Sequence, residues 1–251
     1  GSLGAVRNAG VRASRGDLVA FVDSDCVPTP DWLAHGIAAF ADGDLAVVQG
    51  ATLPDPDATR GRWYVSQEIT AFTNRFEACN LFYRRAALIE AGGFDEAIGF
   101  FGEDSAAGWA VRRLGHGERF EPNAVVHHAV THPGIRWHLR RGLRYGNWNA
   151  LVRRFPEMRA GLWHRYFLRP ASAQTLAALV GFVVAVAAAL AGQVVVVTIG
   201  LAVGWPFWWR HRPYTWRRRD AIVDAAGGAF FDIAVELGLL WGSIRERTFL
   251  L

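Results

Sequence analysis

Two carboxylates that follow an apolar run are the first residues that could do chemistry. Asp23 and Asp25 come directly after Leu18–Val22, a continuous apolar stretch typical of a strand buried on both faces. Carboxylates one residue apart offer hard oxygen ligands, which suit Mg²⁺ or Mn²⁺ together with substrate phosphates. A solvated turn is the alternative, but no basic residue lies within seven positions to neutralise the pair. We therefore predict a divalent-metal site at Asp23 and Asp25.

A second acidic pair, Glu103-Asp104, follows an aromatic and glycine-rich loop at residues 99–102 and opens a predicted helix. Acidic side chains in a first turn also stabilise the helix dipole, so a purely structural role stays open. An ionised carboxylate in a partly dry pocket could instead act as a general base toward a hydroxyl. His127 and His128 end a β-branched run, where one imidazole could complete the metal site or simply be structural.

The elements that must position these side chains alternate along residues 1–133. Apolar patterns and turn residues predict helices at 3–14, 29–40, 63–76, 85–91 and 103–114, and strands at 18–22, 45–48, 80–83 and 124–128. This alternation predicts an α/β fold with a largely parallel sheet between helices. Such sheets bind ligands at the carboxyl ends of their strands, where Asp23 and Asp25 lie.

The composition indicates a second region of different character. Of 251 residues, 51% are hydrophobic and 20% are charged, which is too apolar for an average soluble domain and too charged for a pure membrane bundle. The two cysteines, Cys26 and Cys79, exclude a disulfide scaffold and favour a reducing compartment. The net charge of +4 is unevenly spread, because residues 1–133 carry 11 Arg against 17 Asp and Glu, and residues 134–170 carry 9 Arg against one Glu.

The basic strip at 134–170 is interleaved with tryptophan and precedes an uncharged run from Pro170 to Trp209. This pattern predicts an amphipathic segment at a membrane surface rather than a nucleic-acid interface. The side chains expected nearest to lipid or phosphate are Arg140, Arg141, Arg144 and Trp148. They could clamp an acceptor headgroup or simply attract anionic lipids.

Residues 171–251 are predicted to associate with the membrane. The uncharged run divides into 171–191 and 194–209, which we interpret as a membrane hairpin, with a buried soluble hairpin as the alternative. Arginines flank both ends, so the positive-inside rule places them in the cytoplasm. The last apolar segment, 221–243, carries three acidic residues on one helical face and is predicted to lie in the interface or to span the membrane.

Five short motifs follow one another over residues 1–130. They are Arg7-Asn8-Ala9-Gly10, Leu18–Asp25, Cys79-Asn80-Leu81-Phe82-Tyr83-Arg84-Arg85, Gly92-Gly93-Phe94-Asp95-Glu96 and Gly102-Glu103-Asp104. In order and spacing they resemble family 2 glycosyltransferases with the GT-A fold. The resemblance implies a Rossmann-like catalytic domain and an inverting enzyme of EC 2.4 type. Such an enzyme moves a sugar from a UDP-, GDP- or dTDP-linked donor to a hydroxyl of a cell-envelope glycan or polyprenyl-linked acceptor at the cytoplasmic membrane.

The resemblance also implies roles for individual residues. Asp104 matches the catalytic base. Asp25 and His128 match metal ligands, with Asp23 and His127 in reserve, and the expected metal is Mg²⁺ or Mn²⁺. The nucleotide-sugar site would include Asp23, Asp25, Asn80, Arg7 and Glu103. The basic segment lacks a clean Q-x-x-R-W motif, so a processive polysaccharide synthase is not inferred.

Members of the family usually carry about 70 further residues before the first of these motifs, with a strand of the sheet and part of the donor site. We therefore expect an N-terminally truncated GT-A domain that lacks its first strands, which puts the activity of this chain alone in question. Three other functions stay open. They are a metal-dependent nucleotidyl or phosphoryl transferase, although no G-x-x-x-x-G-K-[ST] loop is present, a non-catalytic membrane-anchored binding module, and a basic membrane scaffold.

Overall fold

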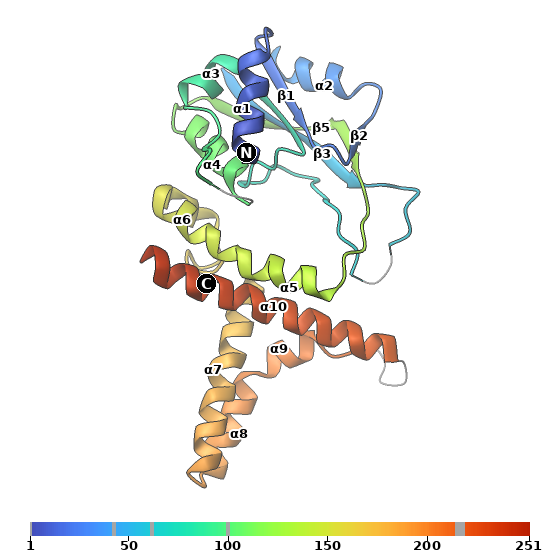
Figure 1. Cartoon of the computed structure of the whole chain (residues 1–251). Coiled ribbons are helices and arrows are strands. Elements are labelled where there is room, and N and C mark those ends of the chain that lie inside the picture. Colours follow the sequence, from blue (N-terminus) through green and yellow to red (C-terminus); the bar gives the residue numbers. More distant parts are fainter. Residues whose placement is uncertain (1, 42–43, 61–62, 99–100, 214–218) are drawn as a thin grey trace. The chain divides into compact units, whose positions relative to one another are not determined.

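A computed structural model describes residues 2–41, 44–60, 63–98, 101–213 and 219–251. The chain divides into two compact units, Gly1–His132 and Pro133–Leu251, here called unit 1 and unit 2. Figure 1 traces the chain through both. Each unit has its own secondary structure and core, and each is described by itself.

Unit 1 is a mixed α/β domain. Its elements are α1 (Leu3–Ala13), β1 (Leu18–Val22), β2 (Cys26–Pro28), α2 (Trp32–Ala38), β3 (Leu45–Pro54), β4 (Asn80–Arg84), α3 (Arg85–Glu90), α4 (Glu103–Arg112) and β5 (Gly117–His128). The sheet order is β1-β4-β3-β5-β2. Helix α2 covers one face, and α1, α3 and α4 lie on the other (Figure 1). The α/β prediction is confirmed.

The prediction of a largely parallel sheet is wrong. Only the β3–β5 pair is parallel among the described strands, whereas β1–β4, β3–β4 and β2–β5 are antiparallel. A parallel return requires a crossover connection, usually a helix. The helix predicted at 63–76 is absent from the described part of that segment, where Val65 and Ile69 form isolated bridges and Trp63 and Phe76 have positive φ angles. Without that helix, β4 returns antiparallel to β3.

The central strands form the core because their side chains are apolar on both faces. β3 and β4 are almost entirely buried. Phe82 packs toward α2, where Gly36 permits close approach, since a Cβ at that position would lie 2.2 Å from the Phe82 ring. Helix α2 begins at Trp32, later than the predicted start at residue 29, and the Thr29 hydroxyl donates a hydrogen bond to the Val125 carbonyl.

Unit 2 is helical. Its helices are α5 (Ile135–Leu143), α6 (Asn147–Arg154), α7 (Pro170–Leu190), α8 (Val194–Val203), α9 (Trp205–Arg210) and α10 (Arg219–Glu246). The hairpin of α7 and α8 is closely packed, because a Cβ at Gly181 would lie 2.3 Å from the carbonyl oxygen of Gly200. Small residues are the usual means by which apolar helices approach so closely. Helix α10 packs against α5 in the same manner, through glycines of both segments.

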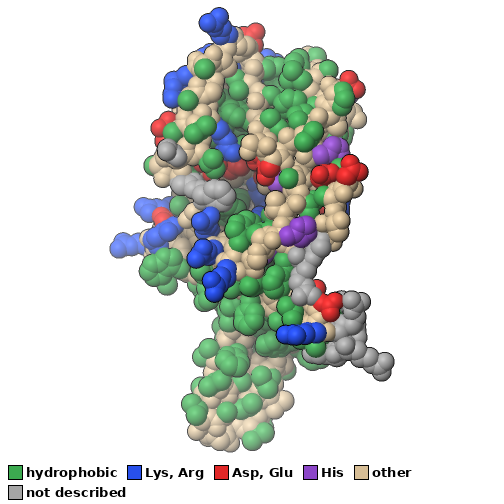
Figure 2. All heavy atoms as spheres, turned by 45° about the vertical axis from the view of Figure 1, so that its right-hand side comes forward, with side chains coloured by type: hydrophobic (Ala, Val, Ile, Leu, Met, Phe, Trp, Pro, Cys, Tyr) green, Lys and Arg blue, Asp and Glu red, His purple; other side chains and the backbone are tan. Residues whose placement is uncertain are grey.

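In the described part of the chain, one helix, α7, is long and apolar enough to cross a membrane. Only 28% of its most apolar stretch is buried, so it differs from the core helix of a soluble protein. Figure 2 shows hydrophobic side chains over the visible face of the hairpin. The second predicted span, 194–209, is interrupted at Gly204 and forms the two shorter helices α8 and α9.

Candidate active site

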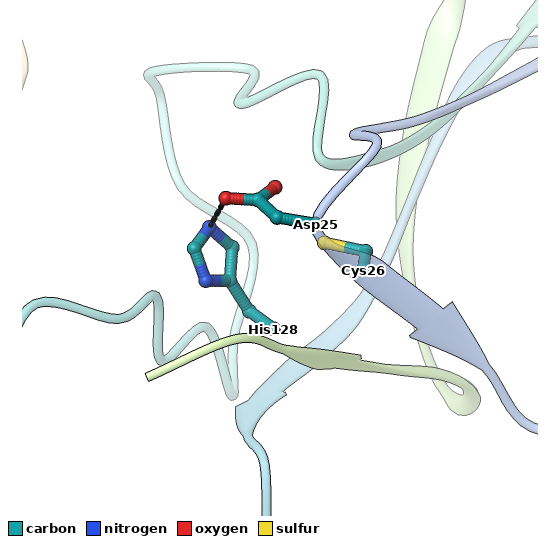
Figure 3. A group of neighbouring side chains, drawn as sticks. All are labelled: Asp25, Cys26 and His128. Carbon is teal, nitrogen blue, oxygen red and sulfur yellow. Dashed lines mark ion pairs between the residues drawn. The ribbon is translucent and has the colours of Figure 1, made fainter. Parts of the chain in front are cut away.

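Asp25, Cys26 and His128 form a cluster of potential metal ligands in unit 1 (Figure 3). The Cys26 amide donates to the Asp23 carbonyl at 3.0 Å, which closes the turn after β1. The Ala129 amide donates to the Asp25 carbonyl at 2.8 Å, which ties this turn to the end of β5. Cys26 and His128 are directly opposed in the β2–β5 ladder, so their side chains share one face of the sheet.

Hydrogen bonds orient the His128 ring for ligation. Nδ1 lies 2.8 Å from the Ala129 carbonyl oxygen and donates to it, which leaves Nε2 with a lone pair. Nε2 lies 3.6 Å from Asp25 Oδ2, so two electron-rich atoms face each other. A divalent cation bound between these two atoms would make this approach favourable. The donor set therefore fits a divalent metal.

The reserve residues lie elsewhere. His127 is on the opposite face of β5 from His128 because neighbouring strand residues alternate. Asp23 is not part of the described cluster and pairs with Arg7 at 3.4 Å. Cys26 was not predicted as a potential ligand, although it adjoins Asp25 in the sequence. Burial and the nearby charges of Asp23 and Asp25 raise the pKa of Cys26 to about 12, so its thiol is protonated near neutral pH.

Arg7 brings the two acidic motifs together. From α1, its guanidinium donates to Glu103 Oε1 at 2.5 Å and pairs with Asp23 Oδ1 at 3.4 Å. The Glu103 side chain is only 4% exposed, so this ion pair is largely shielded from solvent. The end of β1 and the start of α4, 80 residues apart in sequence, are thereby held in one polar site.

Asp104 occupies the first turn of α4 and accepts hydrogen bonds from the backbone amides of Ser105 at 2.8 Å and Ala78 at 3.3 Å. Burial raises the pKa of Asp104 to about 7, and the neighbouring Glu103 carboxylate adds to this. The two hydrogen bonds and the charge of Arg7 reduce the increase. A carboxyl group with such a pKa can accept a proton near neutral pH and release it again.

The segment before β4 is held against α4 by side chains that sequence reasoning did not identify. Ser105 donates its hydroxyl hydrogen bond to the Arg75 carbonyl at 2.5 Å, and Trp109 Nε1 donates to the Asn74 carbonyl at 2.9 Å. On the sheet side, buried Gln49 accepts from the Thr73 amide and donates to Glu77. These contacts fix the Ala78 amide, and through it the Asp104 carboxylate.

Asn80 was predicted to bind the nucleotide sugar, but it is fully buried and bonded within the sheet. Its amide nitrogen donates to the carbonyls of Ala51 and Ala124, each at 2.8 Å, and its oxygen accepts from Trp32 Nε1 at 2.8 Å. The structure therefore gives Asn80 a structural role, in which it joins β4 to β3, β5 and α2.

The basic residues predicted near lipid or phosphate lie in unit 2. Arg140 and Arg144 are exposed, whereas Arg141 is half-buried with its guanidinium 5.3 Å from the Trp137 ring centre. Trp148 is only 5% exposed, so it packs in the interior of unit 2 rather than on its surface. Two of the four predicted side chains are thus exposed at the surface of unit 2.

Comparison with known proteins identifies the class to which this α/β unit is related. The sequence model of Glycosyl transferase family 2 matches residues 2–101, the segment that carries Arg7, Asp23 and Asp25. This match confirms the family 2 resemblance that the motifs predicted.

Two relatives are glycosyltransferases by name. "Pre-mycofactocin glycosyltransferase" of Mycobacterium tuberculosis is 28% identical over 172 residues, which cover 63% of this chain and 36% of that protein. "Glucosyl-dolichyl phosphate glucuronosyltransferase" of Haloferax volcanii is 26% identical over 111 residues, which cover 39% of this chain and 36% of that protein. The chain thus spans about a third of the length of these relatives.

Among solved structures, the mannosyltransferase PcManGT from Pyrobaculum calidifontis, in complex with GDP-Man and Mn²⁺, resembles this chain with a TM-score of 0.59 at 20% identity. The similarity covers 95% of this chain and 66% of that one. It confirms the fold prediction, a mixed α/β fold of the kind found in a mannosyltransferase.

Proposed function

We propose that this chain is the membrane-anchored glycosyltransferase part of an inverting enzyme. It would transfer a sugar from a nucleotide-sugar donor to a hydroxyl of a cell-envelope glycan or lipid-linked acceptor. The observation that carries the proposal is the bridge formed by Arg7, which joins Asp23 at the end of β1 to Glu103, the neighbour of Asp104. This bridge supports the proposal, because the carboxylates that would bind the donor and accept the proton would then share one site.

In the proposed reaction, Asp104 accepts the proton of the acceptor hydroxyl while that oxygen attacks the anomeric carbon. The bond from this carbon to the diphosphate oxygen breaks, and the nucleoside diphosphate leaves on the opposite face. Asp25 and His128 would hold a divalent metal, which when bound neutralises the charge of the diphosphate. Asp23, oriented by Arg7, would contact the donor.

Unit 2 would anchor the enzyme at the cytoplasmic membrane. Support comes from the long apolar helix α7 and from the exposed valine and leucine side chains of the α7–α8 hairpin. Exposed Arg140 and Arg144 would attract the phosphate of anionic lipids or of a lipid-linked acceptor. We propose that α10 lies in the membrane–water interface, because most of its residues are apolar while its buried Asp232 forms ion pairs with Arg169 and Arg210.

The test uses the full chain in detergent with a panel of UDP-, GDP- and dTDP-sugars, Mn²⁺ and polyprenyl-phosphate or glycan acceptors. We expect glycosylated product and release of nucleoside diphosphate. Asp104→Asn should lower turnover by about 10²- to 10⁴-fold while donor binding is retained. Asp17→Asn is the matched control, because exposed Asp17 lies at the opposite end of β1 from Asp23.

Three outcomes would contradict the proposal. Unchanged turnover in Asp104→Asn would remove the base from the mechanism. Release of pyrophosphate, with the nucleotide transferred, would indicate a nucleotidyl transferase. Metal-dependent nucleotide binding without transfer to any acceptor would favour the non-catalytic binding module.

A further inference from the structure

Cys26 contributes a third ligand atom to the metal site. Its Sγ, a ring nitrogen of His128 and a carboxylate oxygen of Asp25 all lie within 4.8 Å of one another (Figure 3). Ligand atoms that bind one Zn²⁺ tetrahedrally at about 2.0–2.3 Å lie about 3.3–3.8 Å apart. The three atoms would therefore have to approach one another by about 1 to 1.5 Å at most, which side-chain rotation can supply.

Backbone contacts hold the Cys26 thiol near the other two ligands. The Cys26 amide donates a hydrogen bond to the Asp23 carbonyl, and Cys26 lies opposite His128 in the ladder between β2 and β5. His128 is oriented by its own bond to Ala129, and its side chain is only 10% exposed. The three ligands thus come from a turn and two paired strands that are already held together, which lowers the entropic cost of metal binding.

Sulfur changes which metals the site prefers. Mg²⁺ and Mn²⁺ prefer oxygen ligands, whereas one thiolate, one imidazole and one carboxylate with an open fourth position form a typical set for Zn²⁺. We propose that Cys26 Sγ ligates Zn²⁺ or a similar thiophilic cation at this site, together with Asp25 and His128. On binding, the sulfur–metal bond forms and the thiol proton passes to solvent, with no change of oxidation state. Zn²⁺ bound at this site would compete with the Mg²⁺ or Mn²⁺ of the proposed transferase reaction. This link to catalysis rests on the proposed function.

The experiment titrates the full chain in detergent with Co²⁺, a coloured substitute for Zn²⁺. We expect a near-ultraviolet thiolate-to-cobalt charge-transfer band that Zn²⁺ abolishes by displacement. The band should be absent from Cys26→Ser and retained in Cys79→Ala, the matched control at the buried second cysteine. Circular dichroism checks that both variants fold.

Affinity provides the second measurement. Any nitrogen and oxygen site binds Zn²⁺ more tightly than Mn²⁺, so the comparison is between variants rather than between metals. Cys26→Ser should weaken Zn²⁺ binding at least about 10-fold, the loss expected even for an outer-shell partner. Mn²⁺ binding should change by less than about twofold, because a hard cation gains little from sulfur.

A band that survives in Cys26→Ser, Co²⁺ binding without the band, or equal Zn²⁺ affinity in both proteins would overturn this inference. These results do not depend on sugar transfer. A chain that transfers sugar but lacks the band keeps its proposed function and loses the zinc site. A chain that shows the band but transfers nothing keeps the zinc site and loses the proposed function.

Discussion

Two aspartates, one in each unit, are shielded from solvent, Asp104 in part and Asp232 almost fully, but they have different neighbours. Asp104 in unit 1 accepts two backbone hydrogen bonds, lies beside the carboxylate of Glu103, and has a pKa raised to about 7 by burial. Asp232 in unit 2 forms ion pairs with Arg169, Arg210 and His211. Burial alone would raise its pKa as well, but the hydrogen bond from His211 and the two arginines lower it.

The comparison shows that the partners of a buried carboxyl group, rather than burial itself, decide its chemistry. The lowered pKa keeps Asp232 ionised near neutral pH. Its ion pairs connect α10 to α9 and to the start of α7. Asp104 titrates in the range where an enzyme works, because its partners stabilise the charge only partly. One carboxylate is thus structural and the other is available as a base.

The largest expected effect concerns Asp232. Asp232→Ala should lower the free energy of unfolding of unit 2 by up to about 3 kcal/mol, because it leaves partly buried cationic groups without their shared partner. Thermal unfolding in detergent measures the change. Glu246→Ala is the control, since its ion pairs with Arg153 and Arg245 are closer to the surface and should contribute less than about 1 kcal/mol. Equal effects of the two substitutions would show that the Asp232 cluster is not a structural centre.

The second prediction concerns the pH dependence of transfer. Because Asp104 must be ionised to accept a proton, kcat/KM should fall about tenfold per pH unit below pH 7 and level off above it. Asp232, whose pKa is lowered, should add no further step in this range. A rate profile from about pH 5.5 to 8.5 measures this. An acid limb near the usual aspartate pKa would contradict the proposed environment of Asp104.

The third prediction is a gain in stability on removal of a carboxylate, whereas the first is a loss. The folded pKa of Asp104 lies above its unfolded value, so this group costs stability as pH rises from about 4 to 7. Asp104→Asn cannot ionise and should stabilise unit 1 by about 1 to 2 kcal/mol at about pH 8. This gain in stability is smaller than the free energy that corresponds to the pKa shift. The Asn side chain has one acceptor oxygen, whereas the Asp104 carboxylate has two, so one backbone hydrogen bond is lost. The difference in melting temperature from the unsubstituted chain should shrink toward about pH 5, and a constant difference would contradict this assignment.

The smallest expected effect concerns Arg7. Its charge lowers the pKa of Asp104, so Arg7→Gln should move the acid limb of the rate profile to higher pH. Arg12→Gln on the exposed face of α1 should leave the limb in place. A limb that stays fixed in Arg7→Gln would mean that Arg7 positions Glu103 and Asp23 without influencing the base.

The sequence predicted most of the local structure and the central motifs. The helix at 3–14, the strand at 18–22 and the helix at 103–114 are present with small differences at their ends. The failures have a common cause. The helix predicted at 63–76 has a suitable pattern of apolar residues, but both of its ends adopt positive φ. Val65 and Ile69 between them form isolated bridges to Thr131 and Thr52. Tertiary contacts outweighed a local propensity.

The same distinction applies to the candidate site. Residue type and spacing alone identified Asp23, Asp25, Glu103, Asp104 and the histidine pair, because carboxylates after a buried strand and at a helix start are visible in the letters. The preference for His128 over His127 was already predicted from the motifs. The position of Cys26 beside His128 and the hydrogen bonds that hold Asn80 within the sheet came only from strand register and tertiary contacts. Register decides which face a side chain occupies, and it depends on pairing between segments about 100 residues apart, which no local pattern encodes.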